Sequence, residues 1–270
     1  MKKKKNPPSE VFDYTEQLYD NFVGIDPGVR AVITSYDVNK QTIQQNTTEY
    51  RHKSKMVYAQ KKRERWYKNW EHFEEWKLIP TMKTSKTSVM KEYFAYVFPK
   101  MEHFWDFHKS KGFRDLKFTA YCRSKAAIIE ICKKIIGGNQ NQNTLVGFGD
   151  FSNQHGLVKR RPLAPIKRLK GQLHKFCKVV DIDEYGTSQT CSECSNRVEL
   201  YKNHIRRKKN GVLEPTARMS NVFSVIRCKN NECKLCLMDR DINAARNILE
   251  LLVLQYLGQE RPACFSRRRH

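Results

Sequence analysis

Apolar and β-branched residues mark three short stretches near the start of the chain. The first is NFVGID at 21–26, and after Pro27 come RAVITSYD at 30–37 and TIQQNTTEY at 42–50. Short runs rich in β-branched residues and bounded by turn-type residues are typical of strands. Because the links between these runs are short, the pattern predicts an antiparallel meander of three strands.

From about residue 53 to residue 136 the apolar positions recur with a helical period, which Pro80 and Pro99 interrupt. The last part of this region, SKAAIIEICKKII, predicts an amphipathic helix that ends at the glycine pair 137–138.

An aromatic stripe lies inside this helical region. Trp66, Trp70 and Phe73 follow one another at i, i+4 and i+7, a spacing that would place them on one helical face. We interpret the stripe as packing within the fold rather than as a platform on which bases stack.

The rest of the chain predicts four further elements around a cysteine-rich segment. They are a buried strand in TLVGFGDF at 144–151, a basic helix at 162–176, a strand in CKVVDID at 177–183 and a helix that begins at Asp239. The final helix, DRDINAARNILELLVLQYL, is acidic in its first turn, where the helix dipole favours negative charge. The predicted order is three strands, helices, strand, helix, strand, cysteine-rich segment and helix.

Composition adds a partner class. The 270 residues include 51 basic and 28 acidic side chains, a formal net charge of +23. Such an excess favours nucleic acid as the partner, although charge alone fits a ribosome- or chromatin-associated protein equally well. The 14 Phe, 12 Tyr and 4 Trp residues argue against a disordered chain.

The sequence also carries an expectation about location. No apolar run is long enough to span a membrane, and MKKKKNPPSEVFDY lacks the apolar core of a secretory signal. We therefore expect an intracellular protein without a membrane partner, located in the nucleus if its source is eukaryotic.

Five of the nine cysteines crowd one segment, as Cys191, Cys194, Cys228, Cys233 and Cys236. Paired thiolates at such spacings suit tetrahedral Zn²⁺, and an all-cysteine site is usually structural because no coordination position stays open. Three cysteines compete for the second pair of positions. We favour Cys228 with Cys233, with Cys236 as a small neighbouring residue and His204 as a distant alternative.

Two aspartates stand where rigid elements end or begin. Asp26 closes the first strand, and Asp241 lies in the first turn of the last helix. Converging carboxylates of this kind hold Mg²⁺, and a pair of such ions promotes phosphodiester hydrolysis. Taken singly, each residue also fits a structural role, as a turn residue and as a first-turn helix acid.

Three motifs in fixed order add a family resemblance. GIDPGVRAV, DEYGTSQTCSEC and DRDINAARNIL resemble the carboxy-terminal half of TnpB and Fanzor proteins, over about residues 21–252. These are transposon-encoded RNA-guided nucleases related to the compact type V CRISPR effectors. The resemblance implies an α/β fold in which an RNase H-like (RuvC) mixed sheet carries a helical insertion and an inserted zinc ribbon.

The resemblance also implies a division of the chain. The expected parts are a basic flexible arm at 1–20, a RuvC-like nuclease domain at 21–186 with its helical insertion at about 53–136, a zinc ribbon at 187–238 that binds target nucleic acid, the last RuvC helix at 239–258 and a basic tail at 259–270.

Residue by residue, Asp26 matches the first metal-binding aspartate of the family and Asp241 the last. Cys191 and Cys194 match the first zinc knuckle. Cys228 and Cys233 fit the second, with a wider spacing that is closer to the Fanzor pattern.

The second acid departs from the TnpB pattern. Gly149 stands where TnpB has a glutamate at the end of a strand. Fanzors resemble this chain in lacking that glutamate and in using an acid just before the zinc ribbon, which here is Glu184. Asp150 and Asp183 are nearby competitors.

The resemblance implies a Mg²⁺-dependent DNA endonuclease in which Asp26, Glu184 and Asp241 hold the ions, with DNA and a guide RNA as partners and structural Zn²⁺. Family members carry a long recognition region before the first strand, and we expect this chain to lack it. Two rival hypotheses compete with this function. One is a catalytically inactive, truncated nucleic-acid-binding remnant of a transposon protein, and the other is a guide-independent RuvC-like nuclease.

Overall fold

The computed structural model describes residues 18–28, 30–137, 143–150, 164–209 and 212–267, and the side chains of 205–217 are left out of the description. The chain divides into two compact units. One is formed by residues 1–47 together with 129–270, and the other by residues 48–128.

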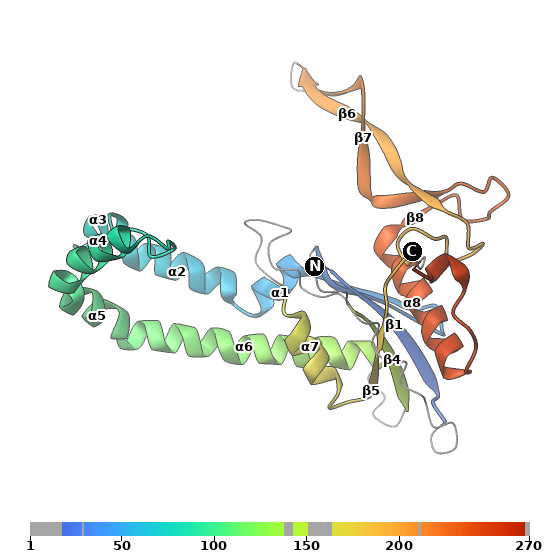
Figure 1. Ribbon diagram of the computed structural model, residues 1–270, viewed down its shortest axis with the longest axis horizontal. Coiled ribbons are helices and arrows are strands. Elements are labelled where there is room, and N and C mark those ends of the chain that lie inside the picture. The colour runs from blue at the N-terminus through green and yellow to red at the C-terminus, as the bar shows by residue number, and fades with distance from the viewer. Residues whose placement is uncertain (1–17, 29, 138–142, 151–163, 210–211, 268–270) are drawn as a thin grey trace. The chain divides into compact units, whose positions relative to one another are not determined.

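A five-stranded sheet forms the centre of the first unit (Figure 1). Its strands are β1 (Asn21–Pro27), β2 (Ala31–Asp37), β3 (Thr42–Asn46), β4 (Thr144–Gly149) and β5 (Lys178–Ile182), in the order β3-β2-β1-β4-β5. The first three strands pair antiparallel, as the sequence predicts, whereas β4 runs parallel to both β1 and β5. The sheet is therefore mixed. The third strand is shorter than expected, because Thr47 already begins a helix.

Helix α8 (Arg240–Tyr256) packs on one face of this sheet. Its side chains join the strands in one hydrophobic core, formed by Leu145, Val180, Ile182, Ile248, Leu251, Leu252 and Phe265. The helix begins one residue later than predicted, because Asp239 caps it. The Asp239 carboxylate accepts hydrogen bonds from the N–H groups of Asp241 and Ile242, at 2.9 and 3.2 Å.

Helix α7 (Ile166–Leu173) is shorter than the basic helix predicted at 162–176, of which residues 162 and 163 lie outside the described part of the chain. Its Lys170 ammonium pairs with Asp181 and lies 5.9 Å from the ring centroid of Phe148. Residues 148 and 147 point to opposite faces of β4, and position 147 faces α8. Helices α7 and α8 therefore cover opposite faces of the sheet.

A second sheet follows the central one in the chain. It is an antiparallel hairpin of β6 (Val198–Lys209) and β7 (Val212–Cys228), to which the short strand β8 (Leu237–Asp239) adds. This three-stranded sheet lies within the segment expected to form the zinc ribbon, and β8 leads directly into α8.

The second unit is helical. It contains α1 (Thr47–Lys53), α2 (Met56–Lys68), α3 (Phe73–Lys77), α4 (Thr87–Val97), the 3₁₀ turn η1 (Phe98–Lys100), α5 (Met101–Lys109) and most of α6 (Lys111–Ile135). Helical structure thus begins at Thr47 rather than at residue 53. None of the helices that the structure describes is long and apolar enough to cross a membrane.

The predicted aromatic stripe is wrong in geometry. Helix α2 ends at Lys68, so Trp70 lies in a turn and Phe73 begins the next helix. Trp70 stacks on Phe107, with ring centroids 4.1 Å apart and an interplanar angle of 5°. These aromatic rings pack against one another within the helical unit, as the packing interpretation expects.

One close approach fixes α8 on the sheet and gives a stability prediction. A β-carbon at Gly24 would lie 2.8 Å from Cα of Leu249 and closer still to Ala245 O and Leu249 N. We expect Gly24→Ala to lower the free energy of unfolding by about 1–3 kcal/mol, since backbone must move to admit the methyl group. Urea denaturation measures this.

Gly171→Ala is the matched control. A β-carbon at Gly171 would have no neighbouring heavy atom within 4 Å, and the residue lies inside α7. This change should raise stability by about 0.5–1 kcal/mol. An unchanged unfolding midpoint for Gly24→Ala would contradict the packing of α8 on β1.

Candidate functional site

The carboxyl ends of three neighbouring parallel strands meet at one edge of the central sheet. Ile25 of β1 lies beside Phe148 of β4, and Gly149 lies beside Ile182 of β5. Asp26 follows Ile25, and Glu184 comes two residues after Ile182. The register therefore brings these two acids to the same edge of the sheet.

Alternation along the strands decides which face these residues use. Gly24 of β1 and Gly147 of β4 both face α8, because added β-carbons there would contact Leu249 and Leu252 respectively. Two residues further on, Asp26 and position 149 face the same way. Asp241 lies in the first turn of that helix.

The Glu184 side chain fills the space above Gly149. A β-carbon at position 149 would lie 2.7 Å from Cδ and 2.9 Å from Cγ of Glu184, and closer still to its Oε1. The carboxyl of Glu184 thus occupies the position that a side chain at 149 would take. A side chain at 149 and the present position of Glu184 exclude each other.

Asp26 lies within the electrostatic influence of both other acids. The pKa of Asp26 is raised well above its ordinary value, first by desolvation and then by the negative charges of Glu184 and Asp241, with Arg240 opposing them. A divalent cation at this edge would relieve that repulsion. The donor set of carboxylate oxygens suits Mg²⁺.

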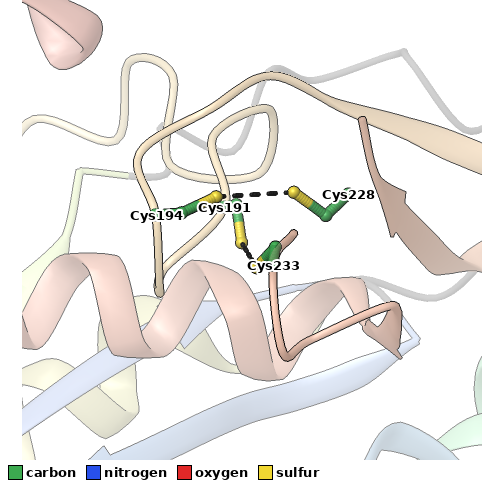
Figure 2. Close-up of side chains that lie close together, drawn as sticks. All are labelled: Cys191, Cys194, Cys228 and Cys233. Atoms are coloured by element: carbon green, nitrogen blue, oxygen red, sulfur yellow. Dashed lines mark hydrogen bonds between the residues drawn. The ribbon is translucent and has the colours of Figure 1, made fainter. Parts of the chain in front are cut away.

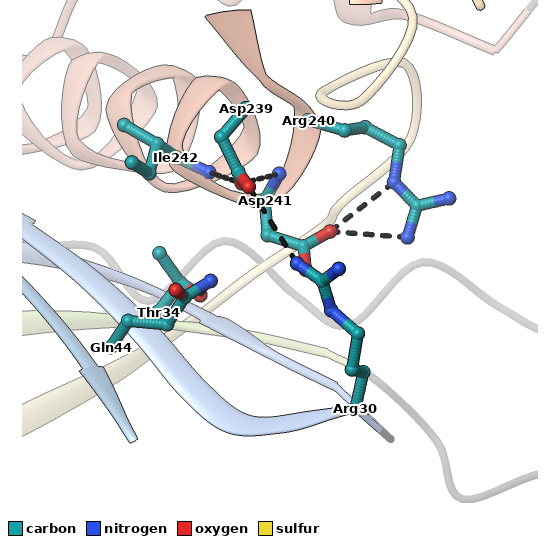
Figure 3. A network of polar contacts seen from close by, with 7 residues as sticks. All are labelled: Arg30, Thr34, Gln44, Asp239, Arg240, Asp241 and Ile242. Carbon is teal, nitrogen blue, oxygen red and sulfur yellow. Dashed lines mark hydrogen bonds and ion pairs between the residues drawn. The ribbon is translucent and has the colours of Figure 1, made fainter. Parts of the chain in front are cut away.

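Two arginines, Arg30 and Arg240, lie beside Asp241 (Figure 3). Nε and Nη2 of Arg240 lie 3.2 and 3.1 Å from Oδ1 of Asp241. Nη2 of Arg30 lies 3.9 Å from Oδ2 of Asp241 and 3.6 Å from Oδ2 of Asp239. Neither arginine was singled out from the sequence. Both could have been found from their place in the two aspartate motifs, Arg30 in DPGVR and Arg240 in DRD.

The competing acids are engaged elsewhere. Oδ1 of Asp150 accepts the N–H of Glu184 at 3.3 Å. The carboxylate of Asp183 accepts two hydrogen bonds from Arg267, at 2.9 and 3.3 Å. Burial alone would raise the pKa of Asp183, but hydrogen bonds from Arg267 and from the Tyr185 N–H outweigh it and lower that pKa. This arrangement favours Glu184 over both.

A four-cysteine group forms a second candidate site (Figure 2). The sulfur atoms of Cys191, Cys194, Cys228 and Cys233 all lie within 4.8 Å of one another. Sγ of Cys191 is 3.8 Å from Sγ of Cys233, and Sγ of Cys194 is 3.5 Å from Sγ of Cys228. A tetrahedron with Zn–S bonds of about 2.3 Å has edges of about 3.8 Å. The geometry therefore fits Zn²⁺.

The protonation of these thiols also matters for metal binding, which requires thiolates. A hydrogen bond from the Asn196 N–H lowers the pKa of Cys194 to about 6. Burial raises the pKa of Cys228 to about 12 in the metal-free protein, so Zn²⁺ must displace a proton there. Cys236, the alternative ligand, is exposed and lies outside the group.

Two buried asparagines attach the cysteine group to α8. The side-chain amides of Asn243 and Asn247 each donate to the carbonyls of Thr187 and Thr190, at 2.7–3.1 Å. The N–H of Ser192 donates to Oδ1 of Asn243 at 2.9 Å. The sequence analysis did not identify these residues, although two amide side chains at i and i+4 on an apolar helix could have indicated a buried polar contact. One helix thus supports both candidate sites.

Comparisons with known proteins agree with this architecture. The Cas12f1-like TNB domain matches residues 169–248, from α7 through the cysteine group into α8. A search of curated proteins found no match.

Among solved structures, that of the mini RNA-guided endonuclease CRISPR-Cas phi3 superposes with a TM-score of 0.51 and 10% identity, over 87% of this chain and 45% of that chain. For the Cas12f1–sgRNA–target DNA complex the TM-score is 0.42 and the identity 17%, over 87% of this chain and 39% of that chain. For CasPhi-2 (Cas12j) bound to crRNA the TM-score is 0.42 and the identity 11%, over 92% of this chain and 49% of that chain.

These findings confirm the predicted fold class, an α/β RNase H-like mixed sheet with helices. The chain spans less than half the length of each of these structures. The Cas12f1-like TNB match supports the family resemblance over residues 169–248, and the narrower Fanzor assignment stays a prediction.

The four-cysteine geometry gives the next prediction. Purified chain should contain one Zn²⁺, and Cys191→Ser and Cys228→Ser should each lose it, because each removes a thiolate of a closed tetrahedral set. Loss of zinc should also lower the melting temperature, since binding of a structural ion contributes to folding. Elemental analysis and thermal unfolding measure the two effects.

Cys236→Ser is the matched control and should retain zinc. Stoichiometric zinc in both ligand variants would refute the site. Loss of zinc from Cys236→Ser, with retention in Cys228→Ser, would show that Cys236 rather than Cys228 is the ligand.

Proposed function

We propose that this chain is the nuclease part of a TnpB-type, RNA-guided DNA endonuclease that hydrolyses phosphodiester bonds with Mg²⁺. The observation that carries the proposal is the position of the Glu184 carboxyl, which fills the space above Gly149 on the face shared with Asp26 and Asp241. The match to the Cas12f1-like TNB domain supports it, as does the fold shared with an RNA-guided endonuclease.

Each acid contributes from a different element. Asp26 projects from a central strand, Glu184 from the segment just after β5, and Asp241 from a capped helix start. Such placements limit how far the carboxylates can move apart when they repel one another. Bound Mg²⁺ would supply an activated water and neutralise charge on the scissile phosphate. The three carboxylates would hold the ions and orient that water.

The zinc role in this proposal is structural. Four thiolates leave no open coordination position, so the ion would hold the β6–β7 hairpin and the start of α8 together. In the family pattern the ribbon contacts target nucleic acid, and we assign it the same role here.

Partners follow from charge and from the compared structures. The net charge of +23 favours polyanions. The compared structures include complexes with sgRNA and target DNA and with crRNA. We propose DNA as the substrate and a guide RNA as the partner of the full-length form. The shift of the second acid to position 184 and the wide second cysteine spacing favour the Fanzor branch.

The proposal predicts the behaviour of the second acid. Glu184→Gln should reduce Mg²⁺-dependent cleavage of DNA to background, because the neutral amide no longer supplies charge to the ions. DNA binding and zinc content should stay unchanged. Cleavage of labelled DNA with guide RNA, an electrophoretic binding assay and elemental analysis provide the three readouts.

Asp150→Asn is the control for the competing acid. It keeps a side-chain oxygen that can accept the Glu184 N–H, so most cleavage should remain. Loss of cleavage in Asp150→Asn with retention in Glu184→Gln would transfer the role to Asp150. The double variant Gly149→Glu, Glu184→Ala places the acid at the TnpB position and should recover part of the activity, whereas Gly149→Glu alone should not fit.

The same assays separate the rival functions. DNA binding without metal-dependent turnover in any variant would support the inactive remnant. Turnover that needs no RNA would support a guide-independent nuclease.

Salt dependence provides a further prediction. If eight phosphates are contacted, log K for duplex DNA should fall with a slope of about −7 against log[salt], at about −0.9 per contact. Binding isotherms at several salt concentrations measure the slope. A nearly flat slope would contradict a phosphate-dominated interface.

A further inference from the structure

The segment after α8 returns to the sheet edge at which Glu184 lies. The 3₁₀ turn η2 (Ala263–Phe265) ends in a phenylalanine that is only 1% exposed and belongs to the same core cluster as Val180 and Ile182 of β5. A β-carbon at Gly186 would lie 2.9 Å from the carbonyl oxygen of Cys264. Residues 261–267 of the expected basic tail therefore contact β5 and the turn that follows it.

Two arginines of this segment hold the residue before Glu184. Nη2 of Arg261 donates to the carbonyl of Asp183 at 2.7 Å, and its Nε donates to the carbonyl of Phe265 at 3.0 Å. Nη2 and Nε of Arg267 donate to the two oxygens of the Asp183 carboxylate, at 2.9 and 3.3 Å. Such a bidentate pair fixes direction as well as distance.

The residue after Glu184 is held by the same segment. The guanidinium carbon of Arg267 lies 5.4 Å from the ring centroid of Tyr185, and the Tyr185 N–H donates to Oδ1 of Asp183 at 3.0 Å. Arg267 thus contacts the residues on both sides of Glu184.

The backbone of Glu184 itself has partners on the sheet side. Its N–H donates to Asp150, at 3.3 Å, and its carbonyl accepts the N–H and the hydroxyl of Thr187, at 3.1 and 2.9 Å. Contacts from the residue after β4, from the turn that follows Glu184 and from the segment after α8 therefore converge on one short stretch. Its central side chain is the one above Gly149.

We propose that residues 261–267 form a clamp that positions Glu184 for divalent-cation binding, with Arg267 as its main positioning residue. The inference rests on the proposed function, in which Glu184 is a metal ligand. Glu184 follows the strand rather than lying in it, so the ladder of β5 does not fix its direction. The clamp supplies that constraint from outside the sheet.

The test measures cation binding and local order directly on the zinc-loaded chain. Mn²⁺, detected by electron paramagnetic resonance, serves as the probe for the Mg²⁺ site. Arg267→Ala should weaken Mn²⁺ binding about tenfold, in the range seen when residues that orient metal ligands are removed. Hydrogen exchange at the amides of residues 184–187 should become faster. Arg267→Lys should recover part of both properties, because it restores charge without the bidentate geometry.

Lys134→Ala is the matched control, since it removes one positive charge and an ion pair with Glu130 on α6. It should change neither readout. If Arg267→Ala fails to fold, Asp183→Asn removes the charge of the partner and should act in the same direction.

The outcomes distinguish the clamp from the metal site it serves. Unchanged Mn²⁺ binding in Glu184→Gln would refute the metal site of the proposed function. Weakened binding in Glu184→Gln, with unchanged binding and exchange in Arg267→Ala and Asp183→Asn, would refute the clamp alone.

Discussion

The contact on which the rest of the first unit depends is the close approach of α8 to β1 at Gly24. Because no side chain separates the strand from the backbone of Ala245 and Leu249, the helix lies in a fixed register on the sheet. That register sets the position of Asp241 in its first turn. It also sets the positions of Asn243 and Asn247, which hold the backbone around the cysteine group. Two chemically different sites therefore share one support.

The sequence predicted the sheet well where local pattern and tertiary environment agree. Strands β1, β2 and β4 are short apolar runs bounded by turn residues, and the more polar β3 follows a short turn, so β-type composition and turn chemistry were enough to place them. The aromatic stripe was wrong because periodicity cannot show where a helix ends. Asn69 stops α2 just before Trp70, and the rings meet through tertiary packing instead.

Local sequence patterns identified only part of the candidate site. Asp26, Asp241 and the cysteine pairs have motif spacing, and the structure brings the four cysteines together. The contacts of Arg267, Arg261 and Phe265 with the turn after β5 depend on residues about eighty positions apart in the chain. No local signal reports such a contact, so the sequence did not predict that Phe265, in a segment expected to be a basic tail, joins the core.

The mutual exclusion of a side chain at 149 and the present Glu184 has an evolutionary meaning. Under the proposed function the third carboxylate can come from either position, but the two places cannot be filled together without a rearrangement of this edge. A lineage that moves the acid from the end of β4 to the segment after β5 would therefore pass through an ancestor in which both side chains compete for one space or through one that lacks the acid. Under the proposed function we expect the two substitutions to be epistatic, so that each arrangement, once established, resists step-by-step reversal.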